Sequence, residues 1–191
     1  MKIKHSLLLR IFLSLLILSV MGVLIFFSGR SVLKTLYPLK YTEFVEVYAE
    51  ENNLSEYFVY AVIKCESGFE NDAVSSVGAK GLMQIMPDTF TWIKTKTGYT
   101  EDYSQATDPE TSIKFGCFLY SYLLKKYGRV QEALAAYHAG IGNVQKWLRD
   151  ERYSSDGKTL HTIPFPTTSK YVKKVMITEN IYQKLYFRKE Q

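Results

Sequence analysis

The chain has 191 residues, 47% hydrophobic and 15% aromatic, and a formal net charge of +5. This length leaves room for one domain with a substantial core and hardly for two. Three of the cations, Lys2, Lys4 and Arg10, fall within the first ten residues. The remainder is only mildly basic and lacks the basic stripe of a nucleic-acid-binding protein, so we expect no nucleic-acid partner.

The first predicted element is an uncharged run, IFLSLLILSVMGVLIFF, over residues 11–27. A membrane-spanning helix needs about 20 apolar residues, with a range of roughly 17 to 25. A cleaved signal peptide would need a small-x-small exit, but this run ends in FFSGRS, where Arg30 stands in the way. We predict a retained transmembrane signal-anchor over residues 1–30, with a cytoplasmic tip and the remaining chain outside the cell membrane. Cleavage of the segment stays open as the alternative.

The remaining chain is predicted to contain a tether over residues 31–41 and one domain over residues 42–191. Apolar residues recur at helical period in seven segments. The predicted helices cover 42–52, 56–66, 87–96, 109–127, 131–138, 143–150 and 167–188. Ser55, Pro87 and the Asp108-Pro109 pair are typical of helix starts, whereas Gly128 and Gly140 are typical of helix ends. Since no stretch alternates with period two, we predict an all-α fold of many short helices.

Glu66 is the sharpest catalytic candidate, because it ends a helix whose preceding residues are apolar. Apolar packing disfavours the charged form of a carboxyl and raises its pKa. Such a group stays protonated near neutrality and can donate its proton to a leaving oxygen. The ordinary alternative is a solvated glutamate near a helix end.

Three later stretches carry further candidates. Gly78 and Gly81 let the backbone approach a ligand closely. Gln84, which precedes the predicted helix over 87–96, can both donate and accept hydrogen bonds. A predicted helix end presents Tyr137 and His138, and Tyr171 lies in the first turns of the last helix. A core position is the alternative for Met83 and for any buried tyrosine, whose hydroxyl then needs a partner.

Four motifs occur in order: E-S-x-F, A-x-S-x-x-G-A-x-G-L-M-Q-I-M-P, A-Y-x-A-G-x-x-x-V-x-x-W and P-F-P-x-T-x-x-Y-V. In this order they resemble the soluble lytic transglycosylase family, with its lysozyme-like domain, over residues 42–188. The resemblance implies cleavage of the β-1,4 bond between N-acetylmuramic acid and N-acetylglucosamine in peptidoglycan, leaving a 1,6-anhydro ring. It also implies a single catalytic carboxyl assisted by the substrate's N-acetyl group, an exception to the usual pair of carboxylates.

The resemblance assigns roles by position. Glu66 is the implied acid and base. The implied substrate-binding residues are Ser75, Gln84, Met86, Tyr137, His138 and Tyr171. Tyr171 is expected to orient the catalytic carboxyl, and Met86 to line the groove. His138 departs from the family's usual Asn: it either makes activity more dependent on pH or replaces a structural hydrogen bond.

Two other functions remain open at this stage. A muramidase of the same fold would use water, and Glu70 or Asp72 would then be the second carboxylate; a catalytically silent glycan-binding scaffold of the envelope is the other alternative. We expect peptidoglycan strands and the membrane as partners, no cofactor, and no metal, since His5 and His161 lack ligand spacing. Protein partners cannot be predicted. Cys65 and Cys117 are either a disulfide or two buried thiols.

Overall fold

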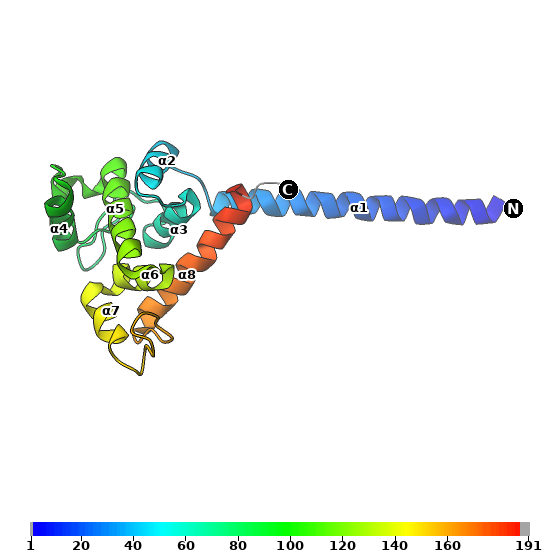
Figure 1. The fold of residues 1–191 in the computed structure, drawn as a ribbon. Helices are drawn as coiled ribbons and strands as arrows, with labels where there is room; N and C mark the ends of the chain where they lie inside the picture. The colour runs from blue at the N-terminus through cyan, green and yellow to red at the C-terminus, as the bar shows by residue number, and fades with distance from the viewer. Residues whose placement is uncertain (1, 188–191) are drawn as a thin grey trace. The chain divides into compact units, whose positions relative to one another are not determined.

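The computed structural model describes residues 2–187, without the side chains of residues 2–11 and 23–27. The chain divides into two compact units, Met1–Pro38 and Leu39–Gln191, both drawn in Figure 1. The first unit contains one long helix, α1 (Lys2–Leu36). Residues 31–36, which we predicted as part of a tether, belong to this helix. Residues 31–37 contain no proline that would interrupt the helix. Pro38 then disfavours helical conformation at Tyr37, the residue that precedes it.

The predicted transmembrane helix falls on α1. Of its apolar run, the side chains of residues 11 and 23–27 lie outside the described residues. Across the part of the chain that the structure does describe, no helix is both long enough and apolar enough to cross a bilayer.

Over residues 39–187, the second unit is built from seven α-helices in the order predicted (Figure 1). They are α2 (Thr42–Glu51), α3 (Glu56–Glu66), α4 (Pro87–Thr97), α5 (Pro109–Tyr127), α6 (Val130–Ala139), α7 (Ile141–Leu148) and α8 (Pro166–Tyr182). A 3₁₀ turn, η1 (Tyr103–Thr107), and a π turn, η2 (Gln183–Phe187), complete it. Within residues 2–187 the only β-type pairing is in isolated bridges around Lys80, so the prediction of an all-α fold is confirmed.

Helix boundaries follow the expected signals, with three differences. The Asp108 side chain accepts a hydrogen bond from the Thr111 backbone amide, and Gly128 ends α5 at a φ of +68°. Gly140 both ends α6 and precedes the first residue of α7, so α7 begins two residues earlier than predicted. Ser55 occupies the N-cap position of α3 without a side-chain capping bond. The last predicted helix changes at Gln183 from α to π geometry.

Helix α3 is the centre of the core. Its six residues from Phe58 to Ile63 are all buried, none more than 4% exposed. A helix that is apolar on every side must be covered on every side, and α3 packs against α2 and, most extensively, against α8. α5 packs against α2, α6 and α4. Glu66, the last residue of α3, is thereby held at the edge of the core.

The loop between α3 and α4 is fastened to the core by η1 and α5. A β-carbon at Gly81 would lie 1.9 Å from the Ala106 carbonyl oxygen, so only glycine fits there. The Tyr103 hydroxyl lies 2.5 Å from the Gly78 carbonyl oxygen and donates to it. The backbone amide of Met83 donates to the Ser112 hydroxyl. These contacts fix the loop beside Glu66 although it has little regular secondary structure.

Gly116 on α5 yields a test of this packing. A β-carbon there would lie 2.2 Å from Sδ and 2.8 Å from Cβ of Met83. We expect Gly116→Ala to lower the free energy of unfolding by about 1–3 kcal/mol, the usual effect of overpacking a core. The measurement is urea unfolding followed by circular dichroism.

The matched control is Gly142→Ala in α7, where an added β-carbon meets nothing within 4 Å. There the change should be neutral or stabilising by about 0.5–1 kcal/mol, because alanine favours helix over glycine. Equal destabilisation by both substitutions would contradict the packing described.

Candidate active site

Three tyrosines and Glu66 form a connected cluster drawn from four helices. The Tyr171 hydroxyl on α8 donates to Glu66 Oε1 across 2.5 Å. The Tyr120 hydroxyl on α5 lies 2.7 Å from the Tyr171 hydroxyl. Since Tyr171 has one proton and gives it to Glu66, Tyr120 must be the donor in that second bond. Of the residues expected at the site, Glu66 and Tyr171 are thus in direct contact.

Tyr137 on α6 extends the cluster to the loop. Its ring stacks on that of Tyr120 with centroids 4.1 Å apart and planes 12° from parallel. Its hydroxyl donates to the Met83 carbonyl oxygen. Tyr137 therefore links the loop before α4 to the tyrosine pair that supports Glu66.

Burial dominates the electrostatics of Glu66. Loss of hydration raises the pKa of its carboxyl to about 7, and the hydrogen bond from Tyr171 and the charge of Lys174 partly offset that rise. Lys174 is held nearby, with Nζ 3.2 Å from the Cys65 carbonyl oxygen. Burial also raises the pKa of Tyr120 and Tyr171 well above the usual value, so both remain neutral. The arrangement leaves Glu66 able to donate and accept a proton near neutral pH.

Ser75 and Gln84 both hold the loop in shape. The Ser75 hydroxyl accepts a hydrogen bond from the Ala79 backbone amide at 2.9 Å. Gln84 adopts a left-handed φ of +48°, and its amide nitrogen donates to the carbonyl oxygens of Ala73 and Gly81. Both N–H groups of Gln84 are therefore used, and its amide oxygen is the atom left for a ligand. Met86 follows at the end of the loop with 38% of its surface exposed.

His138, in the last turn of α6, packs against Tyr171 of the Glu66 cluster. Its ring lies 4.6 Å from the Tyr171 ring, between centroids. Its Nδ1 lies 3.0 Å from the hydroxyl of Thr168, a buried residue in the first turn of α8. Burial lowers the pKa of His138, so the neutral ring is favoured near neutral pH. This hydrogen bond agrees with the structural alternative considered for His138.

A cavity of about 280 Å³ adjoins the cluster and shares Tyr137 with it. Asp88 and Trp92 of α4, Leu119 and Leu123 of α5, and Ile141 of α7 contribute to its lining. The Trp92 ring is braced edge-on by Tyr122, with centroids 4.8 Å apart. The cavity combines apolar and aromatic walls with a few polar groups, which is typical of a ligand pocket.

The remaining candidates do not gather at the site. Glu70 and Asp72 are exposed in the loop after α3. Cys65 and Cys117 are free thiols, and Cys65 donates to the Thr178 hydroxyl at 3.6 Å. In the part of the chain that the structure describes, no three His, Cys, Asp or Glu side chains are grouped as metal ligands.

Comparison with known proteins identifies the family of the chain. Residues 43–160 match the family described as the transglycosylase SLT domain. The chain is 34% identical over 159 residues to the soluble lytic murein transglycosylase of Salmonella typhimurium, covering 81% of this chain but 24% of that protein. It is 28% identical over 170 residues to membrane-bound lytic murein transglycosylase C of Yersinia pestis, covering 78% and 47%. The chain thus spans only a quarter to a half of these relatives.

Among solved structures, lytic transglycosylase Slt of Pseudomonas aeruginosa superposes with a TM-score of 0.70 and 31% identity. The match covers 80% of this chain and 25% of that one, and the solved protein is described as an inactive glutamate-to-glutamine mutant. The family predicted from the four sequence motifs is therefore confirmed.

The raised pKa of Glu66 predicts a stability change that depends on pH. The folded carboxyl keeps its proton up to about pH 7, whereas the unfolded one loses it near 4.5. The folded state binds more protons in this window, so stability falls as pH rises through it. We expect Glu66→Gln to raise the free energy of unfolding by about 1–2 kcal/mol at pH 8. At pH 4 the variant and the parent protein should be equally stable.

Urea unfolding at both pH values measures this effect, and Glu70→Gln, an exposed neighbour, is the matched control. Two results would show that burial does not destabilise the ionised Glu66 carboxyl. One is an equal increase in the free energy of unfolding at pH 4 and pH 8, and the other is the same increase in Glu70→Gln.

Proposed function

The chain belongs to the transglycosylase SLT family, and on that premise we propose that it is a peptidoglycan lytic transglycosylase with Glu66 as its single acid and base. It cleaves the β-1,4 bond between N-acetylmuramic acid and N-acetylglucosamine and leaves a 1,6-anhydro end. The observation that carries the proposal is the half-buried Glu66 carboxyl, bonded to Tyr171 and with a pKa raised to about 7. The inactive glutamate-to-glutamine form of the Pseudomonas aeruginosa protein supports it.

In the first step, protonated Glu66 gives its proton to the glycosidic oxygen. The carbonyl oxygen of the substrate's own N-acetyl group attacks C1 as the bond to that oxygen breaks. In the second step, the Glu66 carboxylate takes the proton of the muramic 6-hydroxyl. O6 then attacks C1, displaces the acetamido oxygen and closes the anhydro ring. Both attacks occur within one sugar, which gives them a high effective molarity.

Tyr171 is a positioning residue in this scheme. Its hydrogen bond to Oε1 stabilises the ionised carboxyl and thereby eases the proton's departure against the effect of burial. The bond from Tyr120 to Tyr171 fixes the direction of that hydroxyl. The pair therefore keeps the pKa of Glu66 close to the pH at which a group can serve as acid and then as base.

The remaining candidates are proposed to bind the glycan. Gln84 offers its amide oxygen to the acetamide N–H, while Ser75 shapes the loop that carries it. Met86 and the cavity beside Tyr137 supply apolar and aromatic surface for sugar rings. His138 holds the start of α8 through Thr168.

The products of peptidoglycan digestion test the reaction. Full-length protein should release muropeptides one water lighter than reducing muropeptides, as read by mass spectrometry, and Glu66→Gln should release none. Reducing products would mean that water is the nucleophile and would turn attention to Glu70 and Asp72. A folded protein that binds peptidoglycan without releasing products would favour a scaffold.

The pH profile tests the role of Tyr171. Activity should fall as rising pH removes the proton from Glu66. The hydrogen bond from Tyr171 lowers the pKa of Glu66, so Tyr171→Phe should shift this fall to higher pH. It should also reduce the maximal rate about tenfold. Tyr153→Phe, which lies outside the cluster, is the control and should leave the profile unchanged. A uniform loss of rate with no movement of the profile would contradict the positioning role.

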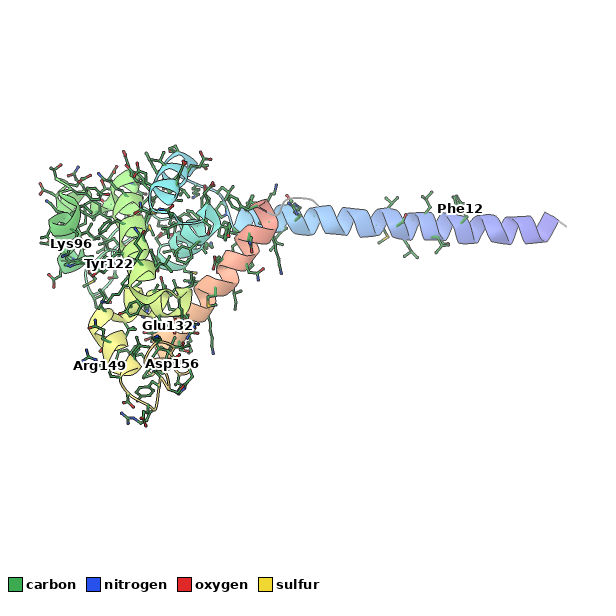
Figure 2. All side chains as sticks on the ribbon, in the orientation of Figure 1. Phe12, Lys96, Tyr122, Glu132, Arg149 and Asp156 are labelled. Carbon is green, nitrogen blue, oxygen red and sulfur yellow. The ribbon has the colours of Figure 1, made fainter. Side chains whose placement is uncertain are left out.

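We also propose that residues 1–30 anchor the enzyme in the cell membrane, with the second unit facing the wall. The support is the uncharged run after Lys2, Lys4 and Arg10. Apolar side chains on α1 are also exposed, such as Leu18 (64%) and Phe12 (63%), of which Phe12 is labelled in Figure 2. The Yersinia pestis relative is named membrane-bound. Expressed protein should stay with the membrane pellet in alkaline carbonate, and a form without residues 2–30 should not. Release of the full-length chain by carbonate would refute the anchor.

A further inference from the structure

A second pocket, of about 430 Å³, lies apart from the Glu66 cluster and shares no lining residue with the cavity beside Tyr137. It is formed by the end of α5, the turn into α6, one face of α7 and the loop around Gly157. Figure 2 shows this region through the labels of Arg149, which directly follows α7, and Asp156 on the loop. The proposed reaction makes no use of it.

The lining of this pocket is cationic. Lys126, Arg129 and Lys158 all contribute to it, and none of its lining residues is acidic. Two carboxylates of the neighbouring loop, Asp150 and Asp156, are engaged by residues of that loop. Asp150 pairs with Arg152 at 2.6 Å, and Asp156 accepts the backbone amides of Lys158 and Thr159. Three cations therefore face one cavity without a carboxylate from its walls.

Helix electrostatics account for only one of these charges. Lys126 lies in the last turn of α5, where the helix dipole favours a cation. Arg129 precedes the first residue of α6, the end at which the dipole disfavours a cation. Lys158 lies in a loop. The helix dipole therefore does not account for the positions of Arg129 and Lys158 at the pocket.

The wall that carries Lys158 is held in place. Asp156 Oδ1 lies 2.8 Å from the Lys158 amide nitrogen and 2.6 Å from that of Thr159. Gly157 takes a φ of +70°, which glycine adopts without strain. The buried carboxylate of Glu132 accepts the Leu160 amide at 2.8 Å. These bonds fix the backbone on this side of the pocket, while the side chains of Lys126, Arg129 and Lys158 are exposed to solvent.

We propose that this pocket is a binding site for an oxyanion, a phosphate or carboxylate group carried by a cell-wall polymer. Arg129 and Lys158 bind the anion from two sides, with Lys126 adding charge. The volume admits the anion together with part of the polymer that carries it. Such a site would tether the enzyme to the wall outside the cleavage site.

The direct test is an NMR titration of full-length Glu66→Gln protein in nonionic detergent with inorganic phosphate, at constant ionic strength against chloride. The amides of Gly128, Gly157 and Lys158 should shift saturably. Arg129→Gln and Lys158→Gln should each weaken phosphate binding about two- to fivefold, as expected for one screened surface charge. Lys96→Gln, on α4 and distant in Figure 2, removes the same charge and should not.

Absence of a saturable shift, or equal weakening by all three substitutions, would overturn the site. The titration does not depend on the proposed reaction, because the Glu66→Gln protein needs only to be folded.

Binding to isolated wall identifies the source of the anion. A polymer phosphate is indicated if two results are obtained. Lys158→Gln must bind untreated wall less than the parent protein does, and the parent protein must bind less once phosphate polymers are stripped from the wall. Retention that survives stripping but still depends on Lys158 indicates the carboxylates of peptidoglycan peptides. Equal retention of Lys158→Gln and Lys96→Gln on both preparations would refute a role at the wall.

Discussion

The hydrogen bond from Tyr171 to Glu66 is the interaction on which the rest of the site depends. Burial alone would hold the proton on the Glu66 carboxyl too tightly and make it a weak acid. The Tyr171 hydroxyl, 2.5 Å away, restores part of the stability of the ionised form. One carboxyl can then serve two opposite proton transfers, provided that Tyr171 is itself held in place, as the bond from Tyr120 ensures.

The fold can be understood as the support for that bond. Glu66 ends α3, whose residues from Phe58 to Ile63 are buried, so the position of the carboxyl is fixed by the core. Tyr171 comes from α8, the helix that packs most closely on α3. The loop beyond Glu66 is held by the close approach of Gly81 to Ala106 and by the Tyr103 hydroxyl. The geometry of the candidate site rests on packed helices as well as on the loop.

The sequence was sufficient for the seven helices of the second unit, since their apolar period and their Pro and Gly boundaries are local signals. It also identified Glu66 and Tyr171 through ordered motifs. Tyr120 was missed because, among the buried residues of α5, it is indistinguishable from a core aromatic. The role of Gln84 in holding the loop was missed because its backbone conformation and two bonds to carbonyls depend on residues brought together only by folding.

The central claim is that Glu66 titrates near neutrality. The most direct measurement is a carbon-13 NMR titration of full-length protein labelled at glutamate side-chain carboxyls, with the Glu66 signal assigned by its loss in Glu66→Gln. A pKa of about 7 for that signal is the result we predict. A signal that titrates near the ordinary 4.5 would show a solvated carboxylate, and the single-carboxyl acid–base account would fail.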